Sequence, residues 1–366
     1  MGISTAVRPS QGIRLGLKAE TAFGVGLDTD LATGGDTTAY LLQPVLSPPT
    51  PPIFNTFRES RLAAGRGTVK NAADTIVNHR GGTITMPFEM YATPRTLAQH
   101  CLLVGQENDQ SGSILHEMEI DGESNPTSIG EAIGGDGIPH SCNLMYDPVE
   151  GDSQGTRVTG VICSDLTISG DVGANNGIVT LSGNYFSGFS NPLTTATTNE
   201  VNFAGTEVAA ETTYYLMHNM STKTLTCDDD VSTMILRSFT FNITNGVTRM
   251  GANTNGDAEG YAFTEYAVTG NLVVKHDAEF SFKAADNVLQ DFLDGDTLAL
   301  AINIGDGTVS SEGECNIAAQ IQYTGQPDLD LGEGGIYLNL PFECVQNSSD
   351  EAFKITSFKN EAVTAW

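Results

Sequence analysis

The sequence predicts a mainly β protein with short flanking helices, in which one β module occurs twice in the same chain. Residue usage leans toward Gly, Thr, Asn, Ser and Val, which favour strands and turns over helices. Apolar and polar residues alternate in short runs that are separated by turn-forming residues. The order strand, polar loop, strand, short helix and hairpin occurs twice along the 366 residues.

The chain divides into an arm, two modules and a linker. Residues 1–52 are expected to form an N-terminal arm, in which residues 12–24 alternate like a strand. The arm ends in LSPPTPPIF (residues 46–54), which has the composition of an extended polyproline spacer. The first module is expected over 53–200 with an insertion at about 106–160, the linker over 201–230, and the second module with a C-terminal strand over 231–366.

The first module contains a well-delimited helix. Thr93 suits the N-cap, Pro94 the first helical position and Gly105 the C-terminal stop. The elements expected in order are FNTFRESRLAAG (54–65), the strand TITMPFEMY (83–91), the helix ATPRTLAQHCLLVG (92–105) and the hairpin SDLTISGDVGANNGIVTLSGNYFSG (164–188).

The second module repeats this order. Val288, Leu289 and Phe292 are expected to form the apolar face of its helix, which ends at Gly295. Its elements are LRSFTFNITNG (236–246), the polar loop MGANTNGDAEG (250–260), the strand GNLVVKHDAEFSF (270–282), the helix AADNVLQDFLDG (284–295) and the hairpin IQYTGQPDLDLGEGGIYLNLPFECV (321–345). Residues 191–213, between the modules, read equally as a linker or an edge strand.

The charge excludes several function classes. A formal net charge of -28 argues against a surface that clamps DNA or RNA phosphates, and against docking on anionic membranes. No stretch has the apolar core of a signal peptide or the length of a membrane span, so synthesis in a cytoplasm without membrane association is expected. The six cysteines form no CxxC pair, and buried free thiols are favoured over disulfides.

No pattern predicts catalysis, a cofactor or a metal. The six histidines are scattered, and His100 and its neighbour Cys101 point apart on a helix. The acidic runs at 227–230 and 294–308 lack the ligand spacing of calcium loops. The glycine-rich runs at 173–177 and 332–335 each join two strands, so they are expected to be hairpin turns rather than phosphate cradles. We therefore expect a protein that is not an enzyme.

Several of these stretches resemble the tail tube proteins (major tail proteins) of long-tailed, siphovirus-type bacteriophages. The resemblance rests on the hairpin at 164–188, the strand–helix unit GGTITMPFEMYATPRTLAQHCLLVG (81–105), the runs TGNLVVKHDAEF (269–280) and LDGDTLALAI (293–302), and the strand EAFKITSF (351–358). The order of these motifs is more specific than any one of them. Together they span most of residues 54–359.

The resemblance implies a structural virion protein made of two tail-tube-type β-sandwich or half-barrel modules. Such proteins assemble in the host cytoplasm into stacked rings that form the viral tail tube, the conduit for DNA ejection. Two modules in one chain favour a homotrimer ring with pseudo-sixfold symmetry over a true hexamer. The other partners implied are a tape-measure protein in the lumen, a tail terminator and tip or baseplate proteins. DNA would pass without specific binding, past an acidic surface that repels phosphates.

Contacts between rings or subunits are expected from the basic loop and from the arm. The polar loops at 64–79 and 250–263 are candidates for contacts between rings. The candidate residues are Arg61, Arg66, Lys70 and Arg80, with Pro48 and Pro52 in the arm. The alternative is another virion β-protein, such as a capsid decoration protein or a receptor-binding fibre domain. A secreted carbohydrate-binding module is disfavoured, because there is one Trp and no signal peptide.

Overall fold

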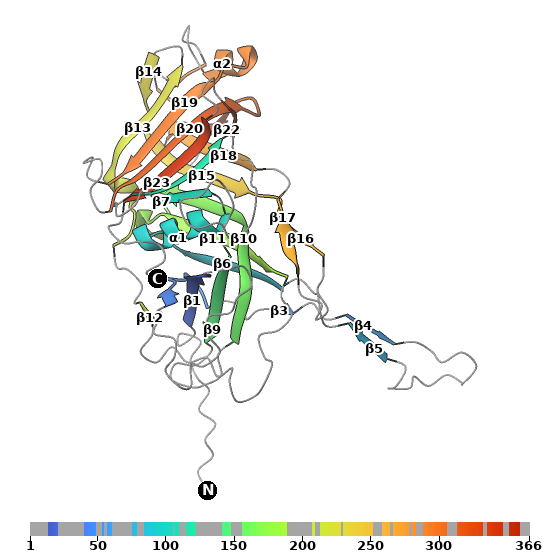
Figure 1. Cartoon of the computed structure of the whole chain (residues 1–366). Helices are drawn as coiled ribbons and strands as arrows, with labels where there is room; N and C mark the ends of the chain where they lie inside the picture. Colours follow the sequence, from blue (N-terminus) through green and yellow to red (C-terminus); the bar gives the residue numbers. More distant parts are fainter. Residues whose placement is uncertain are drawn as a thin grey trace.

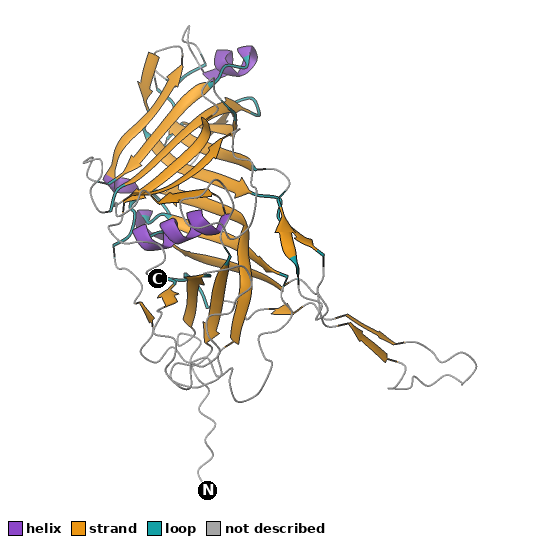
Figure 2. Cartoon of the chain, viewed as in Figure 1, coloured by secondary structure: helices purple, strands orange, loops and turns teal. Residues whose placement is uncertain are grey.

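The protein is mainly β in a computed structural model of the whole chain, which confirms the predicted class (Figure 1 and Figure 2). The structure describes residues 14–20, 40–48, 53–54, 57–60, 75–78, 84–104, 106–109, 115–121, 141–147, 156–188, 207–208, 213–227, 230–251, 258–263, 266–277, 280–282, 288–305, 313–331, 335–346 and 351–358. Within these residues the strands are accompanied by two short α-helices, and neither helix is long and apolar enough to cross a membrane.

Both predicted helices are present. The helix α1 (Pro94–Val104) begins where the Thr93 hydroxyl accepts a 3.2 Å hydrogen bond from the Thr96 amide, which confirms Thr93 as the N-cap. It packs against the sheet strands β8, β10 and β23. The helix α2 (Val288–Asp294) ends at Gly295, whose φ of 71° lies in the left-handed region that a glycine adopts without strain.

A central run of antiparallel strands holds both halves of the chain together. In hydrogen-bonding order it reads β3, β6, β11, β10, β15, β18, β22 and β20. The bounds are β3 (Ile53–Phe54), β6 (Ile84–Tyr91), β11 (Thr180–Ser187), β10 (Thr156–Asp171), β15 (Leu236–Thr244), β18 (Ala267–Lys275), β22 (Tyr337–Cys344) and β20 (Cys315–Tyr323).

Further strands extend this sheet beyond β20 and beyond β10. On one side of β20 lie β19 (Leu298–Ile304), β13 (Met220–Cys227) and β14 (Asp230–Thr233), and on its other side β23 (Glu351–Phe358), β8 (Leu115–Asp121) and β7 (Gln106–Asp109). From β10 the sheet continues to β9 (Cys142–Asp147), β1 (Arg14–Ala19), β2 (Tyr40–Leu42) and β12 (Glu207–Val208). The short β21 (Asp328–Asp330) pairs with β22.

Two hairpins lie outside the main sheet. They are formed by β4 (Phe57–Ser60) with β5 (Thr75–Asn78), and by β16 (Thr248–Met250) with β17 (Gly260–Ala262). Figure 1 shows both projecting from the same side of the molecule. In the sequence, each hairpin connects two strands of the main sheet. The first occurs between β3 and β6, and the second between β15 and β18.

The segments expected as arm, linker and insertion also contribute strands to the main sheet. Leu15 and Leu17 of β1 and Leu41 of β2 are fully buried, and β1 pairs along its whole length with β9. The strand β13 lies within residues 201–230, and β7, β8 and β9 lie within residues 106–160. Residues 207–208 form the short β12, which pairs with β2 in parallel, so part of the stretch at 191–213 is an edge strand.

The core between the sheet layers is centred on phenylalanines. Phe241 of β15 lies 5.5 Å, between ring centroids, from Phe342 of β22 and also from Phe353 of β23. The contact with Phe353 joins the central strands to β23, which lies beyond that run. The described cysteines are free, as predicted, and Cys344 is the one that is partly exposed; the others are Cys101, Cys142, Cys163 and Cys315.

We predict that Phe241→Ala lowers the free energy of unfolding by about 3–5 kcal/mol, because the substitution leaves a cavity among three other rings. Urea denaturation followed by tryptophan and tyrosine fluorescence measures the loss. Val231→Ala is the control, since that side chain is 64% exposed and its removal should change stability by less than about 0.5 kcal/mol. Equal losses in the two variants would contradict this placement of the core.

Candidate functional site

One face of the central sheet is buried and the other is open. Successive residues of a strand point to opposite faces. In β15 the buried set is Phe239, Phe241 and Ile243, whereas Asn242 is exposed between them. The open side is made by the alternate set of residues along most of the central strands, and we call it the polar face. Near the end of β11 this side is covered, because Ala258 and Tyr261 pack against Phe186.

Register pairs align the polar face in rows that cross the sheet. One row runs from Glu89 through Ser182, Thr167, Asn242, Thr269 and Glu343 to Gln322. The next runs from Thr180 through Ser169 and Thr240 to Asn271. Seven strands thus present hydroxyl, amide and carboxylate groups on one surface.

The polar side chains bond to one another across strands. Thr167 donates a 2.9 Å hydrogen bond to the Asn242 amide oxygen, and the hydroxyls of Ser169 and Thr180 lie 2.9 Å apart. The Asn271 amide donates a 2.6 Å bond to Asn339. Such cross-strand pairs fix the side chains to the sheet, so the face is polar and held in place.

The charges on the polar face are acidic except at one end. The acids are Glu89, Asp165, Asp171, Asp328, Asp330 and Glu343. The cations described on this face lie together at one end, where Lys275 ends β18 and the Arg237 guanidinium lies 3.2 Å from the Asp330 carboxylate. Arg237 also lies over the Tyr337 ring, 5.0 Å from its centroid. Most of the face therefore presents either no charge or negative charge.

The two edges of the central sheet differ. At one edge, β21 pairs with β22 alone among the described strands, and Leu329 is 47% exposed there. At the other edge, β6 pairs with β3 near its start, and the amide of Tyr91 donates to the Pro44 carbonyl near its end. Strand alternation directs the nitrogen of Pro87 to that same edge, where it has no N–H to donate.

Most of the contact residues predicted from the sequence lie outside the described residues. These are Arg61, Arg66, Lys70, Arg80 and Pro52. Pro48 is described and exposed, and it follows the stretch that runs beside β6. The polar face was missed as a site, although its signal is present in the sequence as Thr, Ser and Asn at alternate positions of the strands.

His100 has a structural role in α1. It is fully buried, and Nδ1 donates a 2.6 Å hydrogen bond to the Thr96 carbonyl, so Nε2 accepts from the Tyr185 hydroxyl. Desolvation lowers the pKa of His100 to about 4. The ring therefore stays neutral near pH 7 and ties α1 to β11. Within the described residues, no three His, Cys, Asp or Glu side chains are arranged to hold a metal ion.

Comparison with protein-family models and with curated proteins found no match to this chain.

We predict that His100 makes the free energy of unfolding depend on pH between about 6.5 and 4. The unfolded chain binds a proton near pH 6.5, whereas the folded chain resists it down to a pKa of about 4. Stability is therefore lost as pH falls through this window, by about 1.4 kcal/mol per pH unit.

Urea denaturation at a series of pH values measures this loss, with His100→Gln as the comparison. Carboxylates titrate equally in both proteins, so the difference between the two curves isolates the histidine. Parallel curves from pH 6.5 to 4.5 would contradict the prediction.

Proposed function

We propose that this chain is a tail tube protein of a long-tailed bacteriophage, in which three copies close a ring and rings stack into a tube that conducts DNA. The observation that carries the proposal is the pairing of β10 with β15, which joins the two halves of the chain edge to edge into one sheet with a continuous polar face.

The two halves of that sheet are built alike, which supports a duplicated module. In the first half β6 pairs with β11, and β11 pairs with β10. In the second half β18 pairs with β22, and β22 pairs with β20 and β21. All these pairs are antiparallel, and a helix follows β6 and β18 in the chain. The hairpins differ in turn length. Residues 170–179 connect the last paired residues of β10 and β11, whereas residues 331–336 connect those of β21 and β22.

The same kind of pairing provides a route to ring closure. Inside the chain, the edge strand β10 of the first half accepts β15, which lies next to β18. The matching edge in the second half is β21, which pairs with β22 and with no other described strand. At the opposite edge of the sheet, β3 and residues 44–46 lie beside β6. Strand addition between copies would repeat the internal joint. Three chains would then provide six sheet halves around one axis.

The polar face suits the lumen of such a tube. DNA phosphates are attracted by clustered Lys and Arg, and this face has acids and neutral polar groups across most of its area. Its side chains are bonded to each other, which leaves few donors for a passing phosphate. A genome could slide along this surface without specific binding. Catalysis and cofactors have no part in this function, and the implied partners remain a tape-measure protein, a terminator and a tip complex.

We predict that the purified chain at high concentration forms rings, and that these rings stack into hollow tubes. Negative-stain microscopy identifies the tubes, and mass photometry of single rings should give three times the chain mass of 38.7 kDa. Six chains in a ring would contradict the trimer. A monomer at all concentrations, without tubes, would favour the decoration or fibre alternative. Leu329→Lys is the matched variant, because a charge on an exposed edge strand opposes pairing; it should keep the fold and prevent rings.

We also predict that the polar face is shielded in the tube. Thr269→Cys, on the polar face, should react with a bulky polymer-linked maleimide in the free chain and become protected on assembly. Ser221→Cys, an exposed position on β13 in the other sheet layer, should react in both states. The parent chain gives the background, since its described cysteines are mostly buried. Equal labelling of Thr269→Cys before and after assembly would show that this face does not line the lumen.

A further inference from the structure

A short uncharged stretch of the chain lies along the edge of β6. Residues 44–46 run antiparallel to the end of that strand, with Val45 opposite Met90. Met90 is fully buried, and Val45 is partly buried and packs against the same core. We call residues 44–46 the edge segment. They occupy the end of the β6 edge, which strand addition by a neighbouring copy would use in the proposed ring.

Among the described residues, two backbone hydrogen bonds connect the edge segment with β6. The amide of Leu46 donates to the Glu89 carbonyl over 2.9 Å, and the amide of Tyr91 donates to the Pro44 carbonyl over 3.0 Å. Pro44 has no N–H with which to return the second bond. The edge segment is therefore a short and incomplete strand. It can leave the edge without unfolding β6, because β6 stays paired with β11 over its full length.

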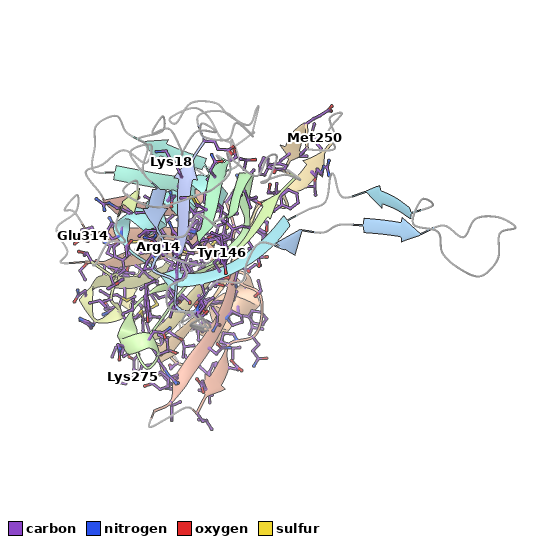
Figure 3. The ribbon with its side chains drawn as sticks, turned by 90° about the horizontal axis from the view of Figure 1, so that it is seen from below. Arg14, Lys18, Tyr146, Met250, Lys275 and Glu314 are labelled. Carbon is purple, nitrogen blue, oxygen red and sulfur yellow. The ribbon has the colours of Figure 1, made fainter. Side chains whose placement is uncertain are left out.

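The stretch that precedes the edge segment is firmly anchored. Figure 3 shows Arg14 of β1 near Tyr146 of β9, and these two strands pair along the whole length of β1. Gln43 is buried; its backbone amide donates to the Leu15 carbonyl over 2.9 Å, and its side-chain amide donates to the Gln99 side-chain oxygen over 2.8 Å. This anchor keeps the edge segment next to β6. In a free chain the edge segment therefore competes with a neighbouring copy at a high effective concentration.

The competing strand is β21 of a neighbouring copy, which matches the edge segment in length and in its apolar residue. It has three residues, and its Leu329 lies opposite the buried Leu338, so the two side chains point to the core side of the sheet. Leu329 is nevertheless 47% exposed, because no described strand covers that edge. On the edge of β6, Leu329 would take the place of Val45 beside Met90.

Charge favours the edge segment over β21 in the free chain. The edge segment has no charged side chain, whereas β21 carries Asp328 and Asp330 on the polar face, where Glu89 of β6 also lies. Arg237 pairs with Asp330, but Asp328 is exposed. Pairing of β21 with β6 would bring like charges onto facing strands, which opposes that pairing.

We propose that the edge segment is an autoinhibitory strand, which keeps the β6 edge closed in a free chain and leaves it when β21 of a neighbouring copy pairs there. This inference rests on the proposed function, because it names what regulates ring closure. Closure then requires an exchange at one edge, in which a pairing within the chain is replaced by a pairing of the same kind between chains. Release of the edge segment is the step that separates free chains from closed rings.

A reversible disulfide tests the exchange directly. Val45 and Met90 are an opposed pair without hydrogen bonds to each other, so their side chains lie close enough for cysteines at these positions to be joined. The full-length chain with Val45→Cys and Met90→Cys, once oxidised, should stay monomeric in sedimentation velocity at concentrations at which the parent forms rings. Reduction should restore rings, so the reduced protein is its own control for folding. The parent chain, oxidised in the same way, should still form rings.

A weakened edge segment tests the opposite direction. Leu46→Pro removes the donor to the Glu89 carbonyl and should lower the chain concentration needed for rings about fivefold. Ser47→Pro, at the exposed next position, is the matched control and should change that concentration by less than about twofold. Rings from the oxidised double variant, or an unchanged concentration for Leu46→Pro, would overturn this inference alone. The absence of rings from the parent chain, the reduced double variant and Leu46→Pro together would instead overturn the proposed function.

Discussion

The arrangement of this protein depends on the pairing of β10 with β15. Residues 165–171 and 238–244 form a continuous antiparallel register, and this is the joint at which the two halves of the chain become one sheet. Because the pairing has no break, the alternation of buried and open residues passes from one half to the other. The buried phenylalanines of β15 and the polar face both depend on that unbroken alternation.

The sequence was informative wherever structure is decided locally. The N-cap of α1, the positive φ angles of Asn175 and Asn176 in the first hairpin turn, and the strand around Phe88 follow from neighbouring residues. The polar face could not be predicted as a surface, because its rows join residues distant in the chain, such as Glu89 with Ser182 and Thr269 with Glu343. Pairing between distant strands depends on packing and not on local preference.

The same limit explains why the N-terminal stretch was difficult to interpret. The stretch around Leu15 was expected as part of an arm, yet β1 pairs with β9, and Leu15 and Leu17 are buried. A short alternating strand in a Gly- and Pro-rich context gives no local sign of its partner. The two hairpins differ in turn length, so residues at the same sequence offset from the start of each hairpin do not occupy the same position in the sheet.

The two edges of the sheet place a physical limit on self-association. A long open edge with every N–H available invites uncontrolled pairing, and natural sheets blunt such edges with proline or short strands. Here β21 has three residues, and the facing edge of β6 lacks a donor at Pro87. A joint between copies would therefore contain fewer backbone hydrogen bonds than the joint between β10 and β15. In the proposed ring, apolar contacts of the exposed Leu329 side chain would have to supply much of the remaining binding free energy between neighbouring chains. That weaker joint makes ring formation depend on a high concentration of chains.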